Sequence, residues 1–174
     1  DFVLFAISGG ASTMLYYPQE DTKDNVEEKI LKLLFKKGAT IQEINTIRKH
    51  SSIARAGGLA KFAYPARVVS IIFSDVLDND IRFIGSGPTV LDNTTIDDAK
   101  KVIDKYEIKE TLNLGEFSFV ESPKENKYFE KVENILLLTN ETALNAMCGM
   151  SERLGYKAVI KNSKLSGEAR SVGT

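Results

Sequence analysis

The loop Ser8–Ser12 places two glycines and two serines directly after an apolar run. Because no large side chain stands beside the glycines, backbone N–H groups there can approach an anion, and the serine hydroxyls can donate to it. The glycine spacing fits neither a Walker A motif nor a G-x-G-x-x-G fingerprint. The pattern predicts either an anion cradle built by Ser8, Gly9, Gly10 and Ser12, or a strand-ending turn that needs only the flexibility of glycine.

A second group of candidate residues is cationic and ends a helical segment. It consists of Arg48, Lys49 and His50, with Arg55 a few residues later. Cations at a helix C-terminus complement the helix dipole, so a structural explanation is available. Their density beside small residues favours an anionic ligand, and we take Arg48 and His50 as candidate anion ligands and Lys49 as a candidate catalytic cation. His50 is the only histidine, and a lone histidine is more often a packing residue than a catalyst.

Three aspartates, Asp75, Asp78 and Asp80, follow the second apolar run. Carboxylates in such a loop could hold Mg²⁺ or accept a hydroxyl proton in phosphoryl transfer. The glycine and the bidentate glutamate that an EF-hand requires are missing. A solvated loop explains Asp78 and Asp80 equally well. Asp75 lies directly at the expected strand end and is our candidate catalytic carboxylate and metal ligand.

Smaller polar groups complete the candidate set. Ser86, Gly87 and Thr89 lie in a Ser-Gly-Pro-Thr segment that supplies small donors, although a plain proline turn has the same composition. Asn140 follows a third apolar run. We take these four residues as candidate substrate- or phosphate-binding residues. For Cys148 and its neighbouring methionines, core packing is a better explanation than metal or redox chemistry.

The elements that must position these residues follow from the apolar pattern. Continuous apolar runs are typical of strands buried on both faces of a parallel sheet. They occur at residues 2–7, 68–73, 135–138 and, more briefly, 158–160. Strand, helix and strand in turn predict one α/β domain over residues 1–174, with a mainly parallel sheet flanked by helices in a Rossmann-like sandwich.

Helices are predicted between these strands from apolar spacing and capping residues. They lie near residues 26–37, 41–50, 58–64, 95–106 and 141–154. Capping boxes are predicted at Thr40 with Glu43 and at Thr95 with Asp98. The charged residues 107–130 are predicted to form a surface connection.

Three of the predicted strands end in small or polar groups, at Ser8–Gly10, Ser74–Asp75 and Thr139–Glu141. In an open parallel sheet, ligands bind beyond the carboxyl ends of the strands. The sequence therefore predicts that these groups form a polar rim at one edge of the sheet.

The composition limits the classes of partner. The 23 basic and 24 acidic side chains leave a formal net charge of −1, so nucleic acid and anionic membranes have no electrostatic attraction to this chain. One cysteine excludes an intrachain disulfide and suits a reducing compartment, so we expect a cytoplasmic protein. A strand begins at residue 2 without an initiating methionine, and a helix start at residues 166–170 lies close to Thr174. Both features lead us to expect an internal piece of a longer protein.

Five blocks of the sequence resemble the type-2 glycerate kinases, some of which were once named hydroxypyruvate reductases. Ile7–Ser12 is similar to that family's S-G-G-G-S loop, and Glu43–Ala60 is similar to its E-x-N-x-V-R-K-H-L-S…K-G-G-x-L-A block. Ser74–Thr89 is similar to its S-D-V…I-A-S-G-P-T segment. Asn140–Leu144 and Leu165–Arg170 match later landmarks, in the family's order.

The resemblance implies ATP-dependent phosphorylation of D-glycerate with Mg²⁺, giving 2-phosphoglycerate, in a protein of two α/β domains with the active site between them. It implies that this chain is the middle of the N-terminal domain and inactive alone, and it leaves a homodimer possible. A hydroxypyruvate reductase and a non-catalytic anion-binding domain are the alternatives. No G-x-G-x-x-G follows any predicted strand, which disfavours the reductase.

Departures from the family's pattern bear on the site. Ala11 replaces a third glycine, Arg55 replaces a lysine, and Asp78-Asn79 replaces a common Gly-Asp pair. An alanine forced to φ > 0 would be strained by about 1 kcal/mol or more. We therefore expect Ala11 to have φ < 0, with Gly9 or Gly10 taking any left-handed turn.

Overall fold

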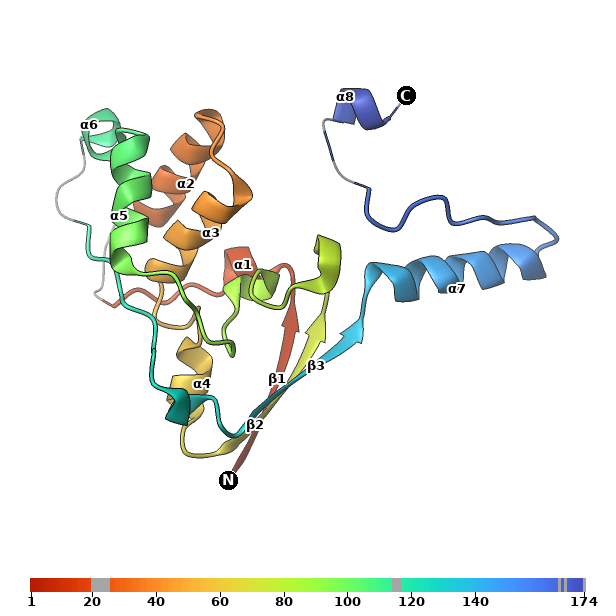
Figure 1. Cartoon of the computed structure of the whole chain (residues 1–174), viewed down its shortest axis with the longest axis horizontal. Coiled ribbons are helices and arrows are strands. Elements are labelled where there is room, and N and C mark those ends of the chain that lie inside the picture. The colour runs from red at the N-terminus through yellow and green to blue at the C-terminus, as the bar shows by residue number, and fades with distance from the viewer. Residues whose placement is uncertain (20–25, 114–116, 166, 168, 174) are drawn as a thin grey trace.

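Three parallel strands form one sheet in the computed structural model of the chain (Figure 1). Their order is β1 (Phe2–Ser8), β2 (Arg67–Phe73) and β3 (Val132–Leu138), with one register shift between β2 and β3 near Phe73. The structure describes residues 1–19, 26–113, 117–165, 167 and 169–173. The strands coincide with the three long apolar runs, so the predicted α/β class with a parallel sheet is confirmed.

The fourth predicted strand is wrong. Residues 158–160 have no regular structure, and Val159 is 71% exposed. Apolar β-branched residues form a strand only where a neighbouring strand takes up their backbone hydrogen bonds. The described sheet offers this segment no neighbour.

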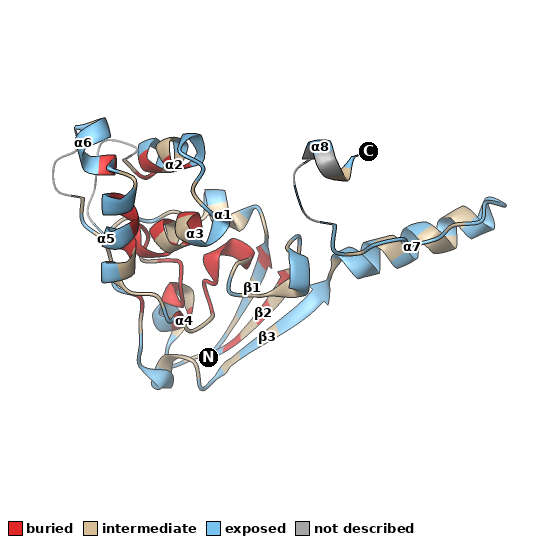
Figure 2. Ribbon diagram, turned by 45° about the horizontal axis from the view of Figure 1, so that its top comes forward, coloured by how far each residue is buried: buried red, intermediate tan, exposed pale blue. Residues whose placement is uncertain are grey.

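Helices α2 (Val26–Lys36), α3 (Ile41–His50) and α5 (Ile96–Lys105) pack together around the main apolar core. Figure 2 shows buried residues in this helical body and also in β1, β2 and the connections between the helices and the sheet. The core includes Ile30, Leu34, Ile44, Ile47, Ala99 and Ile103. Both predicted capping boxes are present, so the predicted starts of α3 and α5 are confirmed.

Residues 107–130 are not merely the surface connection that their charge predicts. They contain helix α6 (Ile108–Leu112), whose Ile108 is fully buried in the helical core. Phe117 and Phe119 also pack against that core. The many charged residues between these apolar residues make the segment polar on average, so its composition did not indicate that parts of it pack in the core.

The remaining elements are short or lie apart from the helical body. Helices α1 (Ala11–Met14) and α4 (Gly58–Ala63) lie in the connections, as do the 3₁₀ turns Leu77–Asn79, Ile84–Ser86 and Asn126–Tyr128. Helix α7 (Asn140–Arg153) follows β3 and projects away from the body (Figure 1), and the last helix is α8 (Ala169–Val172). The predicted helix start there includes Ser166 and Glu168, which lie outside the described residues.

Helix α7 has no packing partner in the described part of the chain. None of its residues is buried, and Met147 and Met150 are 65% and 54% exposed. The core packing predicted for Cys148 and these methionines is therefore wrong within the described residues. The leucines of β3 are exposed as well, among them Leu137 at 53%.

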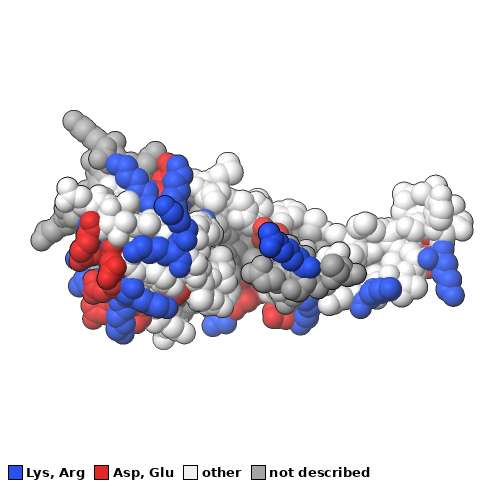
Figure 3. Space-filling model, turned by 90° about the horizontal axis from the view of Figure 1, so that it is seen from above, with Lys and Arg blue, Asp and Glu red and all other residues white. Residues whose placement is uncertain are grey.

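Charged side chains of both signs are interspersed over the helical body on the face that Figure 3 shows. This distribution agrees with the near-zero net charge of the sequence. Among the described helices, none is both long and apolar enough to cross a membrane.

Glu43 links the start of α3 to the end of α5. Its carboxylate accepts hydrogen bonds from Lys105 Nζ at 2.6 Å, the Thr40 N–H at 2.8 Å and the Tyr106 hydroxyl at 2.9 Å. These contacts, the Lys105 bond first, lower the pKa of Glu43 to about 2. Because the folded-state pKa is depressed, Glu43 stabilises the fold above its ordinary pKa, and this contribution is lost as the pH falls toward 2.

Replacing Glu43 by Gln should lower the Tm by about 1–4 °C at neutral pH, because the capping box and ion pair together contribute roughly 0.5–1 kcal/mol. In thermal unfolding followed by circular dichroism, the difference between variant and parent should shrink as the pH falls from about 5 to about 2. Glu28→Gln is the matched control, since Glu28 pairs with Lys32 at 2.6 Å within α2 and both side chains are exposed. A Glu43→Gln difference that persists undiminished near pH 2 would contradict the assigned pKa.

Candidate active site

The carboxyl ends of β1, β2 and β3 lie side by side, because the strands are parallel neighbours (Figure 1). The polar rim predicted at this edge of the sheet is therefore present. A cleft of about 650 Å³ lies between the loops after β1 and β2 and helix α3. Its polar lining consists of Ser12, Thr13, Gln42, Asn45, Arg48, Asp75, Asp78 and Asp80, beside the backbone of Gly9 and Gly10.

Gly9 lies directly against the Asp75 carboxylate. A Cβ atom placed on Gly9 would come within 1.8–2.0 Å of the atoms of that carboxylate, so a side chain at this position must displace Asp75. A Cβ atom placed on Gly10 would meet nothing nearer than the Ser8 hydroxyl, at 3.9 Å. The two adjacent glycines therefore have different roles, which the sequence did not distinguish.

The loop after β1 makes no left-handed turn. Ala11 has φ < 0 as predicted, and neither Gly9 nor Gly10 has a positive φ. The chain enters α1 directly, with the Ser12 N–H donating to the Gly9 carbonyl at 3.1 Å. The N–H groups of Gly10 and Ala11 donate to no described residue, so they remain available to an anion.

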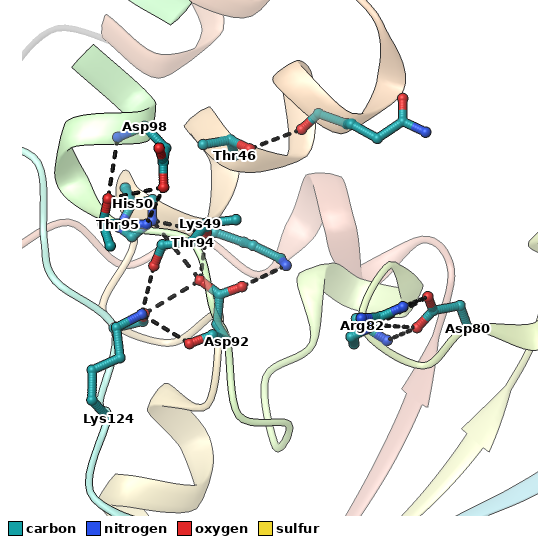
Figure 4. Close-up of polar contacts among 12 residues, drawn as sticks. Thr46, Lys49, His50, Asp80, Arg82, Asp92, Thr94, Thr95, Asp98 and Lys124 are labelled. Carbon is teal, nitrogen blue, oxygen red and sulfur yellow. Dashed lines mark hydrogen bonds and ion pairs between the residues drawn. The ribbon is translucent and has the colours of Figure 1, made fainter. Parts of the chain in front are cut away.

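Of the three aspartates, Asp75 alone has no cationic partner among the described residues. The Arg82 hydrogen bonds, with Nη2 at 2.5 Å from Oδ2, are the main cause of the lowered pKa of Asp80 (Figure 4). Asp78 forms an ion pair with Lys164. Asp75 is exposed at the end of β2. Within the described ranges no three His, Cys, Asp or Glu side chains are grouped to hold a metal ion, so the aspartates form no joint metal site.

Arg48 supplies the cleft with a cation. It lies in the last turn of α3 and is half-buried. Its buried Nε has no hydrogen-bond partner, and its guanidinium forms no ion pair within 4 Å with a described residue, although the charge of Glu27 acts on it from farther away. Burial, followed by the charge of Arg55, lowers the pKa of Arg48, but a guanidinium remains charged at neutral pH. A guanidinium without an ion-pair partner among the described residues, beside backbone N–H groups that donate to none of them, is suited to bind a carboxylate or a phosphate.

Arg55 is 2% exposed and is bound by the protein itself. Its Nη1 pairs with Glu27 and donates to the Arg48 carbonyl at 2.9 Å, and its Nη2 donates to the Ser12 carbonyl at 3.0 Å. Burial raises the pKa of Glu27, while the charge of Arg55 opposes that rise. The Arg55 side chain therefore joins α2, the end of α3 and the loop after β1. Its anionic partner is Glu27 of the protein itself, where the sequence suggested an anionic ligand.

Lys49 and His50 belong to a buried polar network outside the cleft (Figure 4). Lys49 Nζ lies 2.8 Å from Oδ1 of the buried Asp92. Burial alone would raise the pKa of Asp92, but hydrogen bonds from Lys49 and Thr94 lower it. His50 donates from Nδ1 to the Val120 carbonyl at 2.8 Å, and its Nε2 lies 3.0 Å from the Thr94 hydroxyl. These contacts favour structural roles, and the predicted catalytic and anion-binding roles stay predictions.

Ser86, Gly87 and Thr89 are buried and do not line the cleft. Ser86 has φ = 62° between two glycines that are also left-handed, and its carbonyl accepts the Ala56 N–H at 3.0 Å. The Thr89 hydroxyl donates to Asn134 of β3 at 2.7 Å. A strained backbone persists only where its surroundings hold it, so these contacts favour a structural role for the segment.

The structure brings some of the predicted site residues together and leaves others apart. Those that line the cleft are Gly9, Gly10, Ser12, Arg48 and Asp75. Ser8 and Asn140 are exposed at the ends of β1 and β3 but lie outside the cleft lining.

Two lining residues, Gln42 and Asn45, were not among the predicted site residues. They precede Arg48 at intervals of three along α3, so all three side chains share one helix face. That spacing was the signal by which the sequence could have indicated them.

Comparison with known proteins identifies the family. A family model described as "Domain of unknown function (DUF4147)" matches residues 1–115. The chain belongs to this family. The DUF4147 match contains every residue that lines the cleft, from Gly9 to Phe83.

Curated relatives match nearly the whole of this DUF4147 chain. The "D-glycerate 2-kinase" of Thermotoga maritima is 35% identical over 173 residues, covering 99% of this chain and 41% of that protein. The "Glycerate 2-kinase" of Pyrococcus horikoshii is 37% identical over 180 residues, covering 99% and 41%. A "Putative hydroxypyruvate reductase" of Agrobacterium vitis is 36% identical over 176 residues, covering 100% and 45%. The chain thus spans about two fifths of the length of these relatives.

The DUF4147 chain also shares its fold with solved structures. The crystal structure of a glycerate kinase from Thermotoga maritima has a TM-score of 0.73 and 32% identity, covering 92% of this chain and 38% of that chain. A protein of Pyrococcus horikoshii has a TM-score of 0.69 and 34% identity, covering 90% and 37%. The resemblance to glycerate kinases that the sequence indicated is confirmed.

Proposed function

We propose that this protein phosphorylates D-glycerate with ATP and releases 2-phosphoglycerate. The observation that carries the proposal is one cleft at the carboxyl ends of parallel strands that holds both the Asp75 carboxylate and the Arg48 guanidinium, neither of which forms an ion pair with a described residue. Phosphoryl transfer to a hydroxyl needs a group that orients the hydroxyl and positive charge that stabilises the anionic groups. The relatives named glycerate kinase support the choice of substrate.

Each residue of the cleft has a role in this proposal. Asp75 orients the attacking hydroxyl of glycerate and accepts its proton. Gly9, Gly10 and Ser12 form a cradle for phosphate or for the substrate carboxylate, and Arg48 supplies positive charge. Little covalent chemistry is asked of the protein, because positioning and charge neutralisation supply the rate. The other predicted site residues lie outside the cleft lining, and their roles in binding or catalysis stay predictions: Ser8, Lys49, His50, Ser86, Gly87, Thr89 and Asn140.

Asp75 is also the residue that would hold Mg²⁺. This ion is usually bound through one or two carboxylates together with substrate phosphates. An exposed aspartate without a cationic partner among the described residues, set against the Gly9 backbone of an anion cradle, fits that donor set. When bound, Mg²⁺ neutralises charge on the transferred phosphoryl group.

We further propose that residues 1–174 form part of the N-terminal domain of a two-domain, cytoplasmic kinase. The share of the relatives' length that the chain spans, about two fifths, supports this assignment. The chain alone is then expected to be inactive, because the active site would lie between the domains. A homodimer stays an untested prediction.

A hydroxypyruvate reductase is the second candidate, and the name of one relative favours it. Such an enzyme needs a nicotinamide site, and no G-x-G-x-x-G follows β1, β2 or β3. A non-catalytic anion-binding domain is the third candidate. Such a domain would need only the anion cradle formed by Gly9, Gly10 and Ser12.

Two assays on the full-length protein distinguish these candidates. With D-glycerate, ATP and Mg²⁺, ADP should be released in proportion to the glycerate consumed. With hydroxypyruvate and NADH, absorbance at the NADH wavelength should stay constant. NADH oxidation without ATP would support the reductase, and glycerate binding without either reaction would support the binding domain.

Replacing Gly9 by Ala should lower kcat by roughly 10–100-fold and leave the Tm within about 2 °C. The added methyl group would occupy the place of the Asp75 carboxylate, which can rotate away because it ends an exposed side chain. Gly10→Ala is the matched comparison, since its Cβ fits and φ is −57°. It should cause a much smaller loss, and equal losses in steady-state assays of both variants would refute the importance of the Gly9–Asp75 contact.

A further inference from the structure

One face of α3 carries three polar side chains into the cleft. Gln42, Asn45 and Arg48 follow one another at intervals of three residues, and all of them line the cleft. Gln42 is exposed and Arg48 half-buried, whereas Asn45 is only 4% exposed. Asn45 is therefore the most deeply buried of the three residues on the α3 side of the cleft.

Within the described part of the chain, the Asn45 side chain has no hydrogen-bond partner. An asparagine amide carries two N–H donors and a carbonyl acceptor, and none of them bonds to a described residue. Its neighbours on α3 are engaged, since the Thr46 hydroxyl donates to the Gln42 carbonyl at 3.0 Å and Lys49 pairs with Asp92 at 2.8 Å. The polar atoms of Asn45 are not among the fully buried atoms of the described residues that lack a partner, so the amide is open to the cleft and available to a ligand there.

The charges of the cleft are divided between its walls. On the α3 wall, Arg48 is a cation without a described partner. On the opposite side, the carboxylate of Asp75 lies against the Gly9 backbone. A 2-hydroxy acid carries a carboxylate and a hydroxyl on adjacent carbons, so its carboxylate can face α3 while its hydroxyl faces Asp75.

We infer that the Asn45 amide donates a hydrogen bond to the carboxylate of the hydroxy-acid substrate, beside Arg48, and thereby selects substrates that carry this carboxylate. Asn45 is then a specificity-determining residue at the substrate end of the cleft. The inference rests on the proposed function, because it assigns the substrate side of the same site.

The test compares Asn45→Ala and Asn45→Asp with the parent full-length protein. Removing a hydrogen bond to a charged group should raise the KM for D-glycerate by about 10–100-fold in Asn45→Ala. Asn45→Asp should raise it further, since the new carboxylate repels the substrate carboxylate and neutralises Arg48. The KM for ATP should stay within about 2-fold in both variants. Thr46→Ala is the matched control, because Thr46 is the next residue of α3 and does not line the cleft.

Calorimetric titration with D-glycerate and with glycerol, which lacks the carboxylate, supplies a readout independent of turnover. The parent should prefer D-glycerate, and the Asn45 variants should lose most of that preference while Thr46→Ala keeps it. Equal changes in the KM values for glycerate and ATP, or an unchanged preference over glycerol, would overturn the role of Asn45 and leave the kinase proposal intact. Glycerate binding without phosphorylation would refute the kinase while the titration still decides the role of Asn45. No glycerate binding by the folded parent would overturn both.

Discussion

Replacing Asp75 by Asn should lower kcat for glycerate phosphorylation by about 10²–10⁴-fold, the range expected when a catalytic base is removed. The fold should be retained, with the Tm within about 2 °C of the parent, because Asp75 is exposed and pairs with no described residue. Asn has nearly the shape of Asp but cannot accept the hydroxyl proton. Circular dichroism and steady-state kinetics on the full-length protein measure the two quantities separately.

Asp78→Asn is the control for this experiment. Asp78 lies in the same loop, but its carboxylate is paired with Lys164. Its replacement should change kcat by less than about 3-fold, since a surface ion pair contributes little. Near-normal turnover of Asp75→Asn would contradict the role assigned to Asp75, and equal losses in both variants would point to the loop as a whole.

Replacing Arg55 by Met should destabilise the protein by about 3–5 kcal/mol, because it removes the main counter-charge of the buried Glu27 carboxylate and leaves only the more distant charge of Arg48. For a domain of this size that loss corresponds to a fall in Tm of roughly 6–20 °C. The Ser12 and Arg48 carbonyls also lose their donor, so the loop after β1 should be released from the end of α3. Thermal and urea unfolding measure the loss.

Two further variants separate charge from geometry at this site. Arg55→Lys keeps the charge but loses the planar fork that reaches Glu27, Arg48 and Ser12 together, so it should cost less than Arg55→Met but more than a surface change. The double variant Glu27→Met with Arg55→Met should recover much of the lost stability, because no unpaired charge remains. Full stability of Arg55→Met alone would mean that the buried pair contributes nothing.

The parts of the fold that depend on local signals were predictable from the sequence. The capping boxes at Thr40 and Thr95 set the starts of α3 and α5, and the three long apolar runs became the three strands. Residues 158–160 have the composition of a strand, but composition cannot supply the neighbour that a strand requires. The anchors in residues 107–130 were missed because their contacts are with helices far away in the sequence.

Part of the candidate site was also predictable from the sequence, and part was not. The polar rim was predictable, because parallel strands bring their carboxyl ends to one edge. Which of the three cations would find an ion-pair partner was not predictable, because Arg48, Lys49 and Arg55 look alike in the sequence. The fold pairs Arg55 with Glu27, 28 residues earlier, and Lys49 with Asp92, 43 residues later. Arg48 is left without a partner among the described residues, and that is why it becomes the cation of the cleft.

We propose that the cleft beyond β1 and β2 serves transfer of a phosphoryl group to the 2-hydroxyl of glycerate. Phosphorus NMR of the product formed by the full-length protein from D-glycerate and ATP tests it most directly. Phosphate on the 2-oxygen couples to one neighbouring proton and gives a doublet, whereas phosphate on the 3-oxygen couples to two and gives a triplet. We predict the doublet of 2-phosphoglycerate, absent in the Asp75→Asn variant. A triplet, or no new phosphate ester, would contradict the claim.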